Sequence, residues 1–123
     1  MATRSYIGIQ NEDGSVRSIY CHWDGYPSHN GLLLQEHYSD KEKLNELIDL
    51  GDISSLGSRI RPNSDEPHSY DSPSEDVVVA YHRDRGEEYI RPREDDSIET
   101  FVEKGYEEYG YVFTKDGNWL VFN

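Results

Sequence analysis

The chain contains a single cysteine, which excludes an internal disulfide. Such scarcity is typical of proteins that remain in a reducing compartment. No apolar run approaches the roughly 18 residues that a membrane-spanning helix needs. The first residues, Met-Ala-Thr-Arg-Ser-Tyr, also lack the apolar stretch of a secretory signal peptide. We therefore expect a cytoplasmic protein that does not associate with a membrane.

Basic residues are scarce as well. Only 12 Lys and Arg accompany 25 Asp and Glu, so the formal net charge is −13. Residues 1–61 carry nine acids and six bases, whereas residues 62–123 carry sixteen acids and six bases. Affinity for phosphate backbones comes from Lys and Arg that displace counterions, so direct binding to nucleic acid is disfavoured. A basic surface on another protein is the expected partner, and charge that serves only solubility is the alternative.

Apolar residues make up only 34% of the chain, so the core must be small. A length of 123 residues is nevertheless sufficient for one domain. The ten Tyr and two Trp compensate in part, because aromatic rings bury large areas. We expect a single domain over residues 1–123.

The first half of the chain predicts a hairpin followed by two helices. Alternating residues indicate strands over 3–10 and 16–23, joined by the turn signal Asn11-Glu-Asp-Gly14. A helix is expected from about Asn30 to Tyr38. A second helix follows the capping box Ser39–Glu42, carries an apolar stripe at helical spacing and ends at Gly51. Residues 52–60 add a short turn.

Pro, Ser, Asn, Asp and Glu dominate residues 61–74, which predicts a mobile surface loop. Beyond it we expect a hairpin of strands 77–81 and 88–91, then a helix capped by Asp96 or Ser97. Strands over 109–114 and 118–122 close the chain.

The predicted order of elements is ββ-αα-ββ-α-ββ. Paired hairpins covered by helices are typical of an α+β domain. We expect one mainly antiparallel sheet of about six strands, with the helices packed on one face.

The stretch from Ile19 to Pro27 gathers aromatic rings, an imidazole and a carboxylate where the second strand ends. On a strand His22 and Asp24 point the same way, so the carboxylate could orient the imidazole as a general base. The alternative is an aromatic plug that packs beneath a loop. The candidate ligand-binding residues are Tyr20, His22, Trp23, Asp24 and Tyr26, and the catalytic alternative is His22 with Asp24.

Possible metal ligands also cluster here. Cys21, His22, Asp24, His29 and His37 fall within one short stretch. Neither a Cys-x-x-Cys nor a His-Glu-x-x-His pattern is present. We predict no metal and no other cofactor.

Acidic residues of the second half form the other candidate site. Carboxylates spaced on a rigid scaffold can imitate the phosphates of DNA and occupy a basic groove of a nucleic-acid-binding protein. The alternative is a solvated face that binds calcium or nothing, with nearby arginines neutralising part of the charge. The candidate partner-binding residues are Glu87, Glu88, Glu94, Asp95, Asp96, Glu99 and Glu103.

The motif Tyr-Cys-His-Trp-Asp-Gly-Tyr-Pro-Ser at residues 20–28, followed by Asn30 and Gly31, resembles a group of small proteins of bacteriophage and prophage genomes. The resemblance extends over roughly the first half of the chain. It implies a phage setting, in which small acidic proteins are often inhibitors of host enzymes or defence systems. That implication is an analogy and assigns no role to any residue.

These observations favour a non-enzymatic, phage-type accessory protein. It would bind a host protein that has a basic surface, for example a defence nuclease complex, and inhibit it. The alternative is a small-molecule or nucleotide-binding domain, or a small hydrolase, that uses the corner around His22, Trp23, Asp24 and Tyr26. The sequence carries no signal for the oligomeric state.

Overall fold

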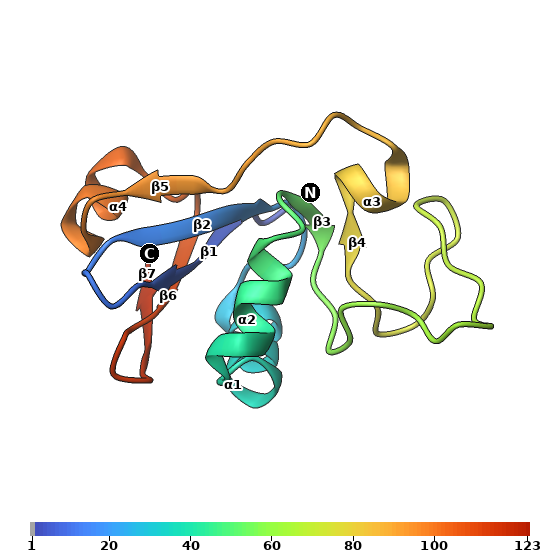
Figure 1. Cartoon of the computed structure of the whole chain (residues 1–123), viewed down its shortest axis with the longest axis horizontal. Helices are drawn as coiled ribbons and strands as arrows, with labels where there is room; N and C mark the ends of the chain where they lie inside the picture. The colour runs from blue at the N-terminus through green and yellow to red at the C-terminus, as the bar shows by residue number, and fades with distance from the viewer. Residues whose placement is uncertain (1) are drawn as a thin grey trace.

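A mixed β-sheet forms the centre of the protein, and the computed structural model describes residues 2–123 (Figure 1). The strands are β1 (Ser5–Gln10), β2 (Val16–Cys21), β3 (Ile53–Ser55), β4 (Val79–Ala80), β5 (Arg93–Asp95), β6 (Tyr109–Phe113) and β7 (Trp119–Phe122). The helices are the π-helical turn η1 (Pro27–Gly31), α1 (Leu32–His37), α2 (Lys41–Ile48), α3 (Tyr81–Arg85) and α4 (Ile98–Lys104). The strand order is β4-β3-β2-β1-β6-β7, and β5 pairs with β2.

The structure confirms both predicted hairpins at the ends of the chain. β1 pairs antiparallel with β2 around Gly14, whose φ of +91° is one that glycine adopts readily. β6 pairs antiparallel with β7. These turns were predictable because a glycine follows an aspartate between two alternating runs.

The prediction of a mainly antiparallel sheet is wrong, because the sheet is mixed. β1 pairs parallel with β6, and β2 pairs parallel with β3. The chain passes from β2 to β3 through η1, α1 and α2, and it reaches β6 through α4. A helical crossover lets the next strand enter the sheet parallel to a neighbour, whereas a tight hairpin does not.

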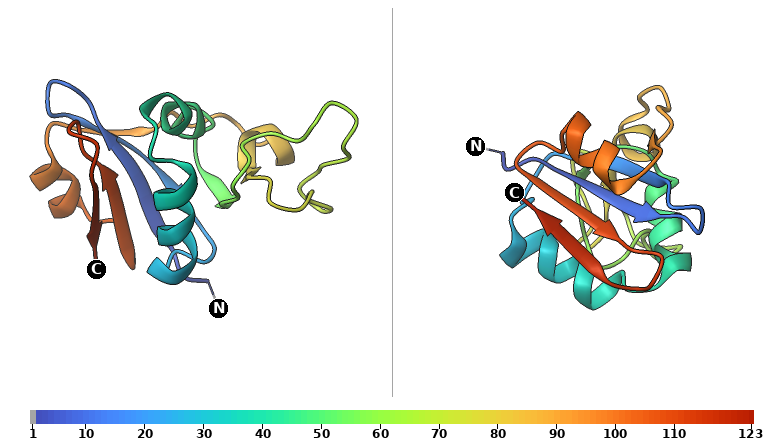
Figure 2. Two further views of the ribbon diagram at one scale, coloured as in Figure 1. Left: turned by 90° about the horizontal axis from the view of Figure 1, so that it is seen from below. Right: turned by 90° about the vertical axis from the view of Figure 1, so that its left-hand side faces the viewer.

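The helices cover both faces of the sheet, not one face as predicted. α1 and α2 lie on one side, and α4 lies on the other (Figure 2). The larger core lies beneath α1 and α2 and contains Ile7, Ile19, Leu47, Ile53 and Tyr111. A smaller core beneath α4 contains Val16, Phe101 and Val112. The alternation of side chains along each strand supplies both cores, since successive residues point to opposite faces.

The predicted hairpin between strands 77–81 and 88–91 does not form. Residues 81–85 fold into α3, because the Asp84 carboxylate accepts a hydrogen bond from the Ala80 N–H at 2.7 Å. Gly86, with a φ of +77°, ends the helix. A glycine after a polar run suits a hairpin turn and a helix end equally well.

Two other helix boundaries differ slightly from the prediction. The first helical segment begins at Pro27, and Asp40 caps α2 by accepting the Glu42 N–H, in place of Ser39. The α4 cap is Ser97, as one of the two predicted alternatives, and its side chain accepts the Thr100 N–H.

The segment predicted as a mobile loop has no helix or strand, and it extends away from the sheet beyond β4 (Figure 1). Glu66 is its main anchor, since both carboxylate oxygens accept hydrogen bonds from Arg59, at 2.8 and 2.9 Å. These bonds hold the pKa of Glu66 well below its usual range. The His68 side chain is buried beside Asp84, at 3.3 Å. Within residues 2–123, no helix combines the length and apolarity that crossing a membrane requires.

Asp95 joins β5 to α4 from the interior. Its carboxylate lies 3.0 Å from the Arg93 Nε and 3.0 Å from the Lys104 Nζ, and its side chain is fully buried. Arg93 also donates to the backbone carbonyls of Phe101 and Gly105, at 3.1 and 2.7 Å. One ion-paired cluster therefore fastens the last turn of α4 to the edge of the sheet.

We predict that Asp95→Asn lowers the free energy of unfolding by about 1–3 kcal/mol, because Arg93 loses a charged hydrogen-bond partner and Lys104 loses its ion pair. Asp96→Asn is the matched control, since Asp96 is exposed and a surface change of this kind costs within about 0.5 kcal/mol. Urea unfolding of both variants measures the difference. Equal stability of the two variants would contradict the structural role of Asp95.

Candidate functional site

The corner that follows β2 turns the chain sharply between the sheet and the helices. The N–H groups of His22 and Trp23 still pair with β3, donating to the carbonyls of Ile53 and Ser54 at 3.2 and 3.0 Å. Asp24 then adopts a left-handed conformation, with a φ of 56°. Aspartate tolerates this conformation better than most residues, which explains why the turn can form here.

Gly25 is required at this corner by close packing. A Cβ atom at this position would lie 2.8 Å from the Thr3 carbonyl oxygen and 2.8 Å from the Ser5 Cβ. The Gly25 N–H donates to that same Thr3 carbonyl at 2.8 Å, and the Tyr111 hydroxyl donates to the Gly25 carbonyl at 2.6 Å. The corner is therefore tied to both β1 and β6.

Asn30 is fully buried and closes the turn from within. Its Nδ2 donates to the Trp23 carbonyl at 3.1 Å and to the Cys21 Sγ at 3.4 Å. Its Oδ1 lies 3.0 Å from the His29 Nδ1. Because the amide nitrogen is already the donor on the other side, Oδ1 must accept, so the proton of a neutral His29 ring sits on Nδ1.

The five residues predicted to bind a ligand do not converge on one point. Tyr20 and His22 stay together, with the Tyr20 hydroxyl 2.7 Å from the His22 Nδ1. The Trp23 ring packs edge-on against His22, with centroids 4.8 Å apart, and remains 42% exposed. Asp24 instead receives the Tyr26 hydroxyl at 3.4 Å. The strand ends at Cys21, so the two-residue period no longer aligns His22 with Asp24.

No dyad for catalysis forms at this corner, because the hydrogen-bond partner of His22 is Tyr20 and not Asp24. Cys21 lies in the core on the opposite side, where it is fully buried. Burial raises the pKa of the Cys21 thiol to about 12, so it is not a nucleophile at neutral pH.

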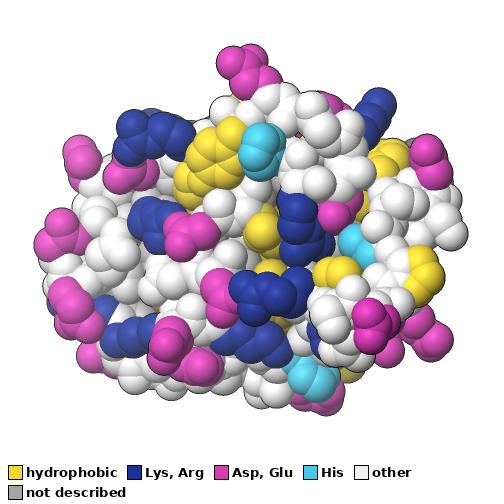
Figure 3. Space-filling view, turned by 45° about the vertical axis from the view of Figure 1, so that its right-hand side comes forward, with side chains coloured by type: hydrophobic (Ala, Val, Ile, Leu, Met, Phe, Trp, Pro, Cys, Tyr) yellow, Lys and Arg dark blue, Asp and Glu magenta, His cyan; other side chains and the backbone are white. Residues whose placement is uncertain are grey.

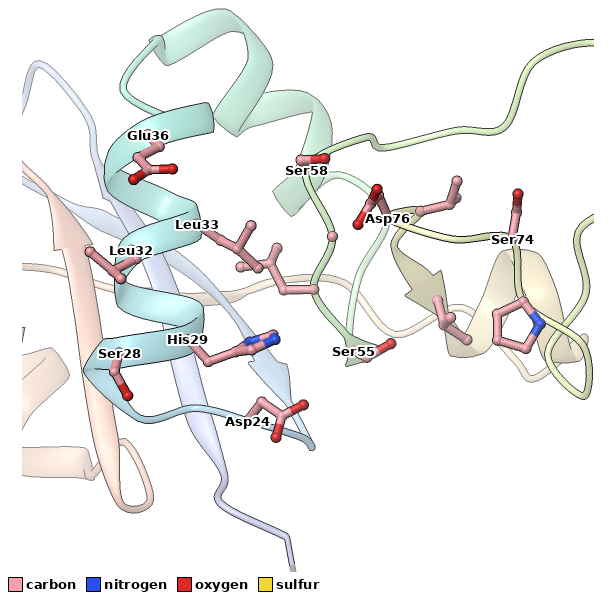
Figure 4. A pocket seen from close by; sticks show the side chains of 15 residues that line it. Asp24, Ser28, His29, Leu32, Leu33, Glu36, Ser55, Ser58, Ser74 and Asp76 are labelled. Atoms are coloured by element: carbon pink, nitrogen blue, oxygen red, sulfur yellow. The ribbon is translucent and has the colours of Figure 1, made fainter.

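A cleft of about 490 Å³ lies between the η1–α1 segment and the chain around residues 55–58 and 73–79 (Figure 4). Its floor is apolar and includes Leu33, Leu56 and Val77. Asp24 and His29 extend into it from one wall, and Asp76 lies on the other. The remaining polar lining residues are Ser28, Glu36, Ser55, Ser58 and Ser74.

The ionisable side chains that line this cleft are acidic or imidazole groups. Three carboxylates line it, on Asp24, Glu36 and Asp76, and none of its lining residues is Lys or Arg. In its neutral form the His29 ring adds Nε2 as a further acceptor, because the Asn30 contact then holds the proton on Nδ1. Within residues 2–123, no three His, Cys, Asp or Glu side chains group closely enough to hold a metal ion.

The seven predicted partner-binding acids separate into two groups and one buried residue. Asp95 is buried and paired, so it is not part of the surface. Glu87 and Glu88 follow α3 at one end of the molecule, whereas α4 lies at the other end (Figure 1). The rest lie exposed on the segment 94–108, here named the α4 lobe: Glu94, Asp96, Glu99 and Glu103.

Charge over the rest of the surface is mixed. Figure 3 shows Asp and Glu side chains spread around the rim of one face, with several Lys and Arg side chains toward its middle. Two basic side chains bind the backbone, since Lys43 donates to the Ser58 carbonyl at 2.9 Å and Arg83 to the Ile60 carbonyl at 2.6 Å. The α4 lobe differs, because seven of its residues are acids and only Lys104 is a base.

Sequence reasoning missed the contribution of His29 and Asp76 to the cleft, and the role of the buried Asn30 in holding His29. His29 and Asn30 follow the aromatic corner directly, so a helical start at Pro27 would have indicated that they face the end of the strand. Asp76 carries no such signal, because it reaches the cleft through the long irregular segment before β4.

Comparison of the chain with protein-family models, curated proteins and solved structures gave no significant match.

We predict that native Cys21 reacts very slowly with a thiol reagent at about pH 8, because its thiolate is suppressed by burial. The same residue should react at once in denaturing urea. The unfolded thiol ionises near 9.0 and the folded one at about 12, so the folded state retains the proton longer. Ionisation of the Cys21 thiol therefore lowers the free energy of unfolding as the pH rises from about 9 to about 12. Rapid labelling of the native protein would show that the corner is open.

Proposed function

We propose that this protein works by binding, and that its α4 lobe docks on a basic surface of a partner protein. The phage resemblance makes the partner a host protein, which the docked lobe would inhibit by covering its nucleic-acid-binding surface. The observation that carries this proposal is the concentration of charge at the lobe. Residues 94–108 hold seven acids and one base, a net of −6 in fifteen residues, and all of these acids except the buried Asp95 are exposed.

The charges of the lobe are available to a partner. Asp96, Glu99 and Glu103 are exposed, and within residues 2–123 none of the three carboxylates forms an ion pair or a hydrogen bond. Glu107 has only a long contact with Arg4, at 3.9 Å, between two exposed side chains. Exposed pairs at such distances contribute little, so most of the negative field remains unneutralised.

The lobe is also held in place, which a docking surface needs. Ser97 caps the start of α4, and Arg93 binds the carbonyls at its end. Phe101 anchors the helix to the sheet and is fully buried. Carboxylates on such a supported helix lose little conformational freedom on binding, and that favours affinity.

Two findings weigh against catalysis as the main function. Within the described residues 2–123, the predicted general base His22 pairs with Tyr20 and with no carboxylate, and the cysteine is buried. A binding role requires neither, because complementary charge acts through the potential of the surface.

We predict that the triple variant Asp96→Lys, Glu99→Lys, Glu103→Lys abolishes capture of basic, nucleic-acid-binding proteins from a host lysate. Exposed interactions of this kind weaken steeply with ionic strength, since the Debye length is about 10 Å at 0.1 M salt. Captured proteins should therefore be released by salt and by added duplex DNA.

The matched control is Asp65→Lys, Asp71→Lys, Glu75→Lys, which changes the net charge equally at exposed positions of the 61–76 segment. Circular dichroism checks that both variants fold. If the control loses its captured proteins as fully as the lobe variant does, net charge and not the lobe carries the binding.

A second candidate function is favoured by the cleft, whose three carboxylates and oriented His29 suit a small cationic ligand. Such a ligand would donate hydrogen bonds to His29 Nε2 and to Asp24 and Asp76 across the cleft. It differs from the predicted corner site, since only Asp24 is common to both.

We predict that arginine amide, titrated into the labelled protein, shifts the NMR signals of residues lining the cleft. Asp24→Asn should weaken this binding, whereas Asp49→Asn, an exposed acid on another surface, should not. Shifts that spread evenly over all exposed acids would indicate unspecific attraction and would exclude a cleft site.

A further inference from the structure

β7 forms the outer edge of the sheet, with β6 on one side and, among residues 2–123, no strand on the other (Figure 2). Its four residues are Trp119, Leu120, Val121 and Phe122, and none is charged. Two of them are unusually exposed for apolar residues, Leu120 at 37% and Val121 at 53%.

The backbone of β7 presents unused hydrogen-bonding groups outward. The Thr114 N–H donates to the Asn118 carbonyl at 2.8 Å, which fixes Asn118 as a residue that faces β6. Antiparallel ladders alternate from residue to residue, so Leu120 and Phe122 also face β6. Trp119 and Val121 therefore point their N–H and C=O groups away from the sheet.

Natural sheets usually protect such edges with lysine, proline, a bulge or a covering segment. β7 has neither residue type, and its register with β6 is continuous from Trp119 to Phe122. Beside it lies a groove of about 320 Å³ against α1. The groove residues are Pro27, Gly31, Leu32, Leu34, Gln35, Tyr111, Trp119 and Val121, none of them charged.

We propose that this edge pairs with β7 of a second copy of the chain. Antiparallel pairing about Leu120 places Trp119 opposite Val121 of the partner subunit, so both outward-facing residues of each copy exchange hydrogen bonds. Leu120 then lies next to Leu120 of the partner subunit, on the face of the sheet opposite to the side chains of Trp119 and Val121. The strand is thus complementary to itself, as a two-fold interface requires.

Charge is the reason to assign a second copy to this surface. Each copy carries a net −13, so two copies repel one another over most of their surfaces. The β7 edge and its groove are uncharged, so contact here adds no like-charge pair. Leu32, 48% exposed at the rim of the groove, supplies further apolar area beside Val121.

The geometry of the pair has a further consequence. Antiparallel continuation of a sheet relates the two copies by an axis perpendicular to it, so both α4 helices lie on the same face. The dimer would present two acidic lobes on one side. Repulsion between those lobes opposes association, and added salt screens it.

Sedimentation equilibrium of the full chain over a wide concentration range tests the proposal. We expect the mass to rise from 14.3 kDa toward twice that value, and to rise at lower concentration when salt is added. This salt response is opposite to that of binding to a basic partner.

Val121→Pro should keep the chain monomeric, because it removes an outward N–H and leaves the bonds to β6 intact. Val121→Lys should do the same by placing a charge on the edge, and it remains informative if proline disturbs the fold. Ile90→Ser is the matched control, since Ile90 is a 65% exposed apolar residue outside β7 and its groove, and it should dimerise as the parent does.

A single-chain mass at every concentration and salt, or dimers of folded Val121→Lys as stable as the parent, would overturn the proposal. Pairing of the edge only with a strand of another protein would overturn it too. A chain that remains monomeric and still captures basic proteins through the α4 lobe would overturn the dimer alone.

Discussion

The tight corner between β2 and the helices is the constraint on which the positions of both surface hollows depend. Gly25 packs against β1 without room for a side chain, and Tyr111 binds its carbonyl from β6. Asn30 then fixes the start of the helical segment from inside. As a result, η1 and α1 stand between the acidic cleft on one side and the groove beside β7 on the other. The main role of the aromatic motif at residues 20–28 is therefore structural, because it fixes how the helical segment is attached to the sheet.

Charge and apolar area are used at different places on this molecule. Interior charges are paired, as Asp95 is with Arg93 and Lys104. The α4 lobe carries exposed carboxylates with few basic neighbours, while the β7 edge carries none. A surface with separate charged and uncharged patches can bind two kinds of partner under different conditions of salt, because screening weakens one contact and strengthens the other.

Local signals predicted the hairpins, α2 and α4, because turn residues and apolar spacing act over a few positions. The parallel pairings could not be predicted, since β6 joins β1 only through tertiary packing. The burial of Asp95 could not be predicted either, because it depends on a tertiary contact with Lys104 on the following helix. The predicted His22–Asp24 pair does not form, because β2 ends at Cys21 and Asp24 then adopts a left-handed conformation. The acidic character of residues 94–108 could be predicted, because charges can be counted along a sequence without knowledge of the fold.

Amide hydrogen exchange of the chain, free and in complex with a captured basic partner, tests the central claim most directly. The account predicts slower exchange on binding at backbone amides across residues 94–108, with little change around the cleft. Protection confined to the residues that line the cleft, with the α4 lobe exchanging as in the free protein, would contradict it.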